Sequence, residues 1–216
     1  MSPAFAKKFF LYGLVIAALE EFITQGVLKE SCFLWIFTLI PFAVFLGIAG
    51  CVWAVLHRFA TEWLAIVLYY LAAGTMGLAV EWFLIGLSPW SDPSSPLALI
   101  VVFHAGMFSF WGTVALAPRI VLDFRPQVAK LRRCFLRAFA AIGVMTYALT
   151  FAAKAMNAEK NVQFLASVAP VVITFLTMNV FYVSYFRRCR QRRAYPSCDS
   201  HSFADSNVPA AHSAAR

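Results

Sequence analysis

The sequence predicts an all-α membrane protein, a bundle of six transmembrane helices, and three observations support this fold class. Of the 216 residues, 62% are hydrophobic and 13% are charged, whereas soluble domains contain about 45–50% and about 25%. The hydrophobic residues form six runs, each close to the roughly 20 residues that cross the hydrocarbon core of a bilayer. No segment alternates with the period of two that is typical of a membrane β-barrel. Lipid is therefore the expected solvent for most of the surface.

Polar or proline-containing segments separate the six predicted spans. The spans comprise residues 9–28, 32–56, 62–87, 97–118, 134–156 and 162–186. Residues 29–31 form a short polar turn, and residues 88–96 are too rich in serine and proline to continue a helix. Residues 119–133 form the longest predicted internal loop. We expect residues 1–186 to form one transmembrane domain and residues 187–216 to form a disordered, basic cytoplasmic tail, because few of the tail residues are large and apolar.

The distribution of Lys and Arg predicts that both termini are cytoplasmic. If the N-terminus lies inside, all but three of the 18 basic residues fall in inner segments. The three exceptions are Lys29, Lys154 and Lys160. This bias is the one that the positive-inside rule describes, and an even number of spans returns the chain to the same side. The sequence therefore predicts a multi-pass protein of the bacterial inner (plasma) membrane.

The net charge of +8 is explained by membrane anchoring. The arginine-rich segment 187–193 directly follows the last predicted span, where arginines contact anionic lipid headgroups. The expected partners are therefore the lipid bilayer and its anionic headgroups, and no nucleic acid. The sequence contains no P-loop, GxGxxG or GxSxG pattern, so we expect no cofactor. The oligomeric state is left open.

Three glutamates and one histidine lie at a similar depth inside the predicted spans. Glu21 is seven residues from the outer end of the first span, Glu81 is six from the outer end of the third, and His104 is seven from the outer end of the fourth. At 1.5 Å per residue, each lies about 10 Å below the outer face. A charge at the bilayer centre costs roughly 2.5–3.5 kcal/mol, so such residues usually face protein and have a function. The candidate site comprises Glu20, Glu21, Gln25, Glu81 and His104.

The two glutamate-bearing segments resemble each other. Glu21 and Gly26, like Glu81 and Gly86, delimit the pattern E-[FW]-x-x-x-G on two spans that run in the same direction. Such a match is consistent with a parallel repeat of helix pairs, as some transporters contain. Gly77 lies one helical turn before Glu81, and small residues beside a carboxylate allow a second helix to approach closely. The glutamates are therefore expected to face other helices.

Several chemistries are compatible with these residues. Carboxylates and an imidazole that are gathered in a low dielectric cannot all be charged without partners, so we expect at least one proton to be held there. The set fits a proton relay or a cation site, or a site for a metal such as Zn²⁺ or Mn²⁺, or water activation in a hydrolase. Alternatively, Glu20 or Glu21 pairs with Lys154 or bonds Thr24 and Gln25, as in an assembly or scaffold protein. The leading interpretation is a site that binds or translocates a cation or small solute.

The heptapeptide EEFITQG, which begins at Glu20, resembles the EExxxR motif of the CPBP (CAAX-processing and bacteriocin-processing) intramembrane proteases. The resemblance implies that Glu20 and Glu21 activate a water molecule and that His104 assists on the oxyanion side. It covers seven of the 216 residues. Gln25 stands where the family has arginine, Ile100 stands where it has phenylalanine, and no second intramembrane histidine follows His104. An intramembrane hydrolase is thus the alternative function.

Two further expectations concern residues away from this level. Asn179 lies in the inner half of the sixth span and is expected to form a hydrogen bond between helices. In the loop 119–133, an interfacial helix is expected, which Pro126 would interrupt. Its apolar face would comprise Ile120, Val121, Phe124, Val128 and Leu131.

Overall fold

A computed structural model describes residues 3–86, 88–89 and 96–191 of the chain. Its described elements are helical and are connected by short turns. They are α1 (Pro3–Glu21), η1 (Phe22–Leu28), α2 (Cys32–Phe59), α3 (Glu62–Val80), η2 (Glu81–Ile85), α4 (Leu97–Leu122), α5 (Pro126–Ala155) and α6 (Lys160–Gln191). The segments η1 and η2 are π-helical continuations of α1 and α3. The all-α fold class predicted from the sequence is confirmed.

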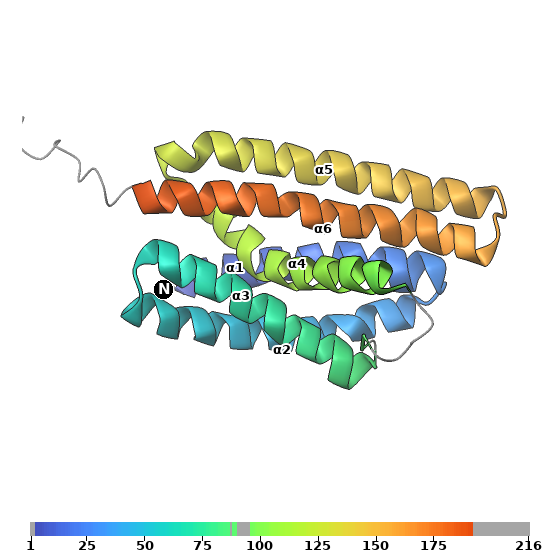
Figure 1. The fold of residues 1–216 in the computed structure, drawn as a ribbon, viewed down its shortest axis with the longest axis horizontal. Coiled ribbons are helices and arrows are strands. Elements are labelled where there is room, and N and C mark those ends of the chain that lie inside the picture. The colour runs from blue at the N-terminus through green and yellow to red at the C-terminus, as the bar shows by residue number, and fades with distance from the viewer. Residues whose placement is uncertain (1–2, 87, 90–95, 192–216) are drawn as a thin grey trace, which may run out of the picture.

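The helices run alternately along one long axis, and the two ends of the described chain lie at the same end of the bundle (Figure 1). We call this the terminal end and the opposite one, which carries the turn at 29–31, the distal end. In the described part of the chain, six helices are long and apolar enough to cross a membrane. These properties indicate a multi-pass integral membrane protein.

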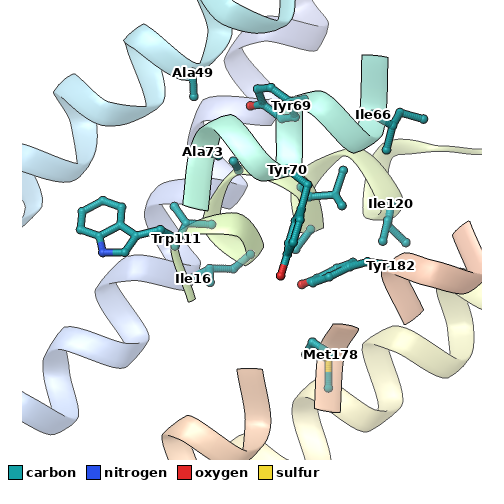
Figure 2. Packing of buried hydrophobic residues seen from close by; sticks show 14 of the residues in the cluster. Ile16, Ala49, Ile66, Tyr69, Tyr70, Ala73, Trp111, Ile120, Met178 and Tyr182 are labelled. Carbon is teal, nitrogen blue, oxygen red and sulfur yellow. The ribbon is translucent and has the colours of Figure 1, made fainter. Parts of the chain in front are cut away.

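Helix α4 is the central element of the bundle. It packs against α1, α3 and α6, and an unbroken stretch of it from Ser109 to Pro118 is buried. Trp111 and Ile120 of α4 lie in the core with Tyr69 and Tyr70 of α3 and Tyr182 of α6 (Figure 2). Residues on α4 are therefore the ones most shielded from lipid.

Two glycines allow α3 and α4 to approach each other closely. A Cβ atom at Gly77 would overlap the indole ring of Trp111, and one at Gly112 would overlap the ring of Tyr70. Only glycine leaves room for an aromatic ring against the neighbouring backbone at these points. The close helix approach expected beside Glu81 is thus present.

The predicted loop 119–133 is wrong. Helix α4 continues through Pro118 to Leu122, and α5 begins at Pro126, so only residues 123–125 connect them. Arg119 remains helical because its guanidinium stacks on Trp53, 3.4 Å from the ring centroid. Proline is also well suited to the first position of a helix, where no backbone donor is needed.

The interfacial helix expected in the same segment is also absent, and the last helix is longer than predicted. Ile120 and Val128 are buried in the core, on α4 and α5 respectively, while Phe124 is exposed in the turn. Helix α6 extends to Gln191, so the arginines that follow the last predicted span belong to the same helix. The first five residues of the predicted tail, 187–191, are therefore helical. The remainder, 192–216, lies outside the described residues.

Candidate functional site

Glu21 and Glu81 occupy matching positions in the backbone. The α-helical geometry of α1 changes to π-helical geometry at Phe22, directly after Glu21, and that of α3 changes at Glu81 itself. π-Helical turns are rare and occur frequently at functional sites. Gly86 ends η2 with a φ of 82°, a conformation that glycine adopts without steric cost. The two segments that share the pattern E-[FW]-x-x-x-G thus both contain a π-helical turn, but Gly26 lies inside η1 whereas Gly86 follows η2.

Glu81 is the buried member of the site. Its side chain is 8% exposed, and one of its oxygens, Oε1, accepts a hydrogen bond of 3.0 Å from Nε1 of Trp111. The carboxylate is within Coulombic reach of Glu21 on α1 and of His104 on α4. Glu81 is thus in electrostatic contact with ionisable groups of two other helices, and the common depth of these residues in the membrane stays a prediction.

Glu21 is hydrogen bonded within its own helix. Its Oε2 accepts a bond of 3.1 Å from the hydroxyl of Thr24, and the side chain of Gln25 lies near the same carboxylate. Bonding of Glu21 by Thr24, which the structural alternative included, is confirmed. The bond to Gln25 stays a prediction.

The other form of that alternative, a pairing of Lys154 with Glu20 or Glu21, is wrong. Lys154 Nζ binds Glu30 Oε1 at 2.7 Å and the carbonyl oxygen of Val27 at 2.8 Å. The hydrogen bond and the positive charge of Lys154 lower the pKa of Glu30. Lys154 thus binds at the distal end of α1, where a flexible ammonium group reaches water.

Glu20 faces α5 and α6. It lines a small pocket of about 60 Å³ together with Thr146 of α5 and Thr174 of α6. It is within Coulombic reach of both Glu21 and Glu81, and no described side chain hydrogen bonds or ion-pairs with it. Glu20 therefore has other carboxylates as its Coulombic neighbours, whereas Lys29 acts on Glu21 and His104 acts on Glu81.

His104 lies at the edge of the site. Its Nδ1 donates to the carbonyl oxygen of Ile100 at 2.8 Å, and its ring is 6.0 Å from that of Trp82 between centroids. The side chain also lines an open groove of about 530 Å³ between α3, α4 and α6. His104 is thus in reach both of Glu81 and of a space outside the carboxylate cluster.

No group of three His, Cys, Asp or Glu side chains is placed to hold a metal ion in the part of the chain that the structure describes. The four ionisable candidate residues comprise three carboxyl groups and one imidazole.

A second charged network, at the terminal end, was missed in the sequence. Arg125 binds Glu62 of α3 at 2.7 Å and Asp123 through Nε at 2.8 Å, and Tyr185 of α6 donates to Asp123 at 2.9 Å. Burial opposes ionisation of Asp123, but the hydrogen bonds from Arg125 and Tyr185 lower its pKa below the ordinary value. The signal was an Asp-x-Arg-Pro turn between two spans.

Asn179 forms the interhelical hydrogen bonds expected of it. Its side-chain oxygen accepts from the hydroxyl of Tyr70, and its amide nitrogen donates to Ser109 Oγ at 2.8 Å. Next to it, Tyr182 donates to Thr113 Oγ1 at 2.7 Å. The four hydroxyl residues were not singled out in the sequence, because such residues are unremarkable in an apolar helix until their partners are known.

No family model, curated protein or solved structure matches the chain. The functional interpretation is accordingly built on the geometry of the site.

Proposed function

We propose that the protein binds and translocates a cation, or a small solute together with a cation, at the intramembrane cluster of Glu20, Glu21, Glu81 and His104. In this proposal both termini are cytoplasmic, the protein belongs to the bacterial inner membrane, and the cluster lies in the outer half of the bilayer. The basic residues at the terminal end then contact anionic headgroups of the inner leaflet.

One observation carries the proposal. The three carboxylates are in mutual Coulombic reach. None of them forms a salt bridge with a described Lys or Arg, and Lys29 is within Coulombic reach of Glu21 alone among them. Carboxylates that share a poorly solvated site repel one another, and an unpaired buried charge is strongly destabilising. Protons or a bound cation restore the balance of charge. A group that exchanges such a charge with either side of the membrane is a transport site.

The test is cation flux in reconstituted vesicles. Glu81→Gln keeps the size of the side chain and an acceptor for Trp111, but it removes the exchangeable charge, so we expect flux to be abolished. Glu159→Gln changes an exposed acid outside the spans and is expected to behave as the wild type. Wild-type flux of protons and of monovalent cations in the Glu81→Gln protein would overturn the proposal.

The hydrolase alternative is favoured by one feature, the adjacent pair Glu20 and Glu21 beside a π-helical turn. It makes a different prediction for the same set of variants. A hydrolase that uses this pair loses turnover of a membrane-embedded peptide in Glu20→Gln and Glu21→Gln, whereas Glu81→Gln retains part of it. A scaffold protein shows neither cation flux nor peptide turnover in the wild type. In that case the glutamate variants differ from the wild type only in a lower melting temperature.

A further inference from the structure

A row of hydroxyl groups continues from the candidate site toward the terminal end. Ser109 and Thr113 of α4 face α6, where Asn179 bonds the first at 2.8 Å and Tyr182 bonds the second at 2.7 Å. Thr113 is fully buried and Tyr182 is 1% exposed. The Thr113 hydroxyl itself donates to the carbonyl oxygen of Ser109 at 2.6 Å, so two hydroxyl groups lie one turn apart on α4, each bonded to a side chain of α6.

The open groove joins this row to the candidate site. The wall that contains His104 also contains Ser109, and Asn179 and Tyr182 line the same groove from α6. Polar groups at membrane depth usually face protein or a water-filled space. The groove has a volume of about 530 Å³ and is lined mainly by apolar side chains, so water would bind only beside its polar members, such as His104, Ser109 and Asn179.

Two buried polar atoms lie apart from this row, on Tyr69 and Arg119, whose side chains both pack on Trp53 of α2. The hydroxyl of Tyr69 and Nε of Arg119 have no hydrogen-bond partner among the described residues. An unsatisfied buried polar group costs about 1–3 kcal/mol, and internal water commonly removes that cost. Arg119 is in Coulombic reach of Tyr185 and Asp123, which are bonded to each other at 2.9 Å. One turn of α6 after Tyr182, a second set of polar groups therefore begins at Tyr185 and includes Asp123 at the terminal end.

We propose that this row is a proton path and that the cation taken by the candidate site is therefore the proton. The proposal rests on the function proposed above. A proton enters at Glu81 and His104, and one proton leaves beside Asp123. In the structure Tyr182 donates to Thr113 and Thr113 donates to the Ser109 carbonyl, so both hydroxyl groups must rotate before Thr113 can release a proton to Tyr182. No electron is transferred and no bond to carbon changes.

The contacts in the row explain the choice of the proton. Oxygen atoms that are 2.7 to 2.9 Å apart leave no room between them for a hydrated metal ion, whereas a proton moves along such contacts without displacing either atom. Asn179 is a positioning residue in this scheme, because its amide fixes Ser109 and Tyr70 while the hydroxyls carry the proton. Asp123 and Glu62 face two arginines, Arg119 and Arg125, so the exit is balanced in charge.

The experiment measures proton flux into vesicles that contain a trapped pH-sensitive dye, with a potassium diffusion potential as the driving force. Tyr182→Phe keeps the ring and removes the hydroxyl, and Thr113→Val keeps the shape of the side chain. Each is expected to lower the flux by about tenfold or more. The control is Thr150→Val, since Thr150 is a buried hydroxyl that bonds only its own helix, at 2.9 Å from the carbonyl of Thr146. Its flux is expected to equal that of the wild type.

The outcomes separate this inference from the proposed function. If Glu81→Gln abolishes flux while Tyr182→Phe and Thr113→Val both keep it, the site stands and the proton path is refuted. Wild-type flux of sodium or potassium without a change in internal pH also refutes the path and leaves the site intact. If the wild type moves protons and Glu81→Gln is unaffected, the proposed function itself fails. Equal melting temperatures of Thr113→Val and Thr150→Val exclude unfolding as the cause of a lost flux.

Discussion

Replacing Gly77 with alanine tests how the site is built, because Gly77 holds Trp111 against α3. The added Cβ would overlap the indole ring, so the ring or the backbone of α3 must move. Overpacking of this kind costs about 1–3 kcal/mol. If Trp111 moves, its hydrogen bond to Glu81 is also lost, which costs about 1.5–3 kcal/mol for a charged acceptor. Alanine recovers about 1 kcal/mol of helix propensity. The expected net destabilisation is about 1.5–5 kcal/mol.

The assay is thermal unfolding of the purified protein in detergent, where 1 kcal/mol corresponds to about 2–4 °C for a chain of this size. Matched controls are Gly47→Ala in α2 and Gly143→Ala in α5, where an added Cβ meets no atom within 4 Å. These variants are expected to melt at or slightly above the wild-type temperature. If Gly77→Ala melts with the controls, Trp111 is not held as the structure has it, and the support of Glu81 by its indole is refuted.

The remaining predictions concern the two ends of the bundle. The pKa of Asp123 lies below its ordinary value of 3.8, so its ionisation stabilises the fold above that pH, and the contribution is lost as the pH falls through the lower folded value. The melting temperature should therefore drop on acidification below about pH 4, and less steeply in Asp123→Asn; equal slopes in both proteins would contradict this. At the other end, Lys154→Met should change neither the melting temperature appreciably nor the flux, because Lys154 pairs with the exposed Glu30. A loss of flux in that variant would restore Lys154 as a partner of the carboxylates.

Much of the fold could be predicted from the sequence because lipid imposes a simple rule. A span must be apolar over its whole length, so the six runs were visible in the order of residues alone, and their number is confirmed in the described chain. The errors arose at the terminal end, where charged residues were interpreted as the end of a helix. Arg119 stays in α4 because Trp53 covers its guanidinium, and no local pattern contains that contact.

The candidate site could be predicted in its depth but only partly in its contacts. Depth follows from the rise of a helix, which predicted one level for Glu21, Glu81 and His104, and Glu81 is within Coulombic reach of the other two. Contacts depend on how helices are rotated, and rotation is decided by packing between distant segments. The bond from Trp111 to Glu81 joins residues 30 positions apart, so it could not be inferred from the spacing on either helix.

The distribution of polar groups in the finished bundle follows the same physics. Helix α4 has the longest buried stretch in the described chain, and a polar group on it has protein on several sides where a lipid-facing helix has hydrocarbon. Hydrogen-bond partners are therefore easiest to supply along α4. Trp111 bonds a side chain of η2, the continuation of α3. Three further side chains bond α6; they are Ser109, Thr113 and Asp123 in the turn after α4. Burying an ionisable group in the membrane therefore requires the least free energy beside this helix. For the same reason, a path for charge from the carboxylate cluster is most favourable along it.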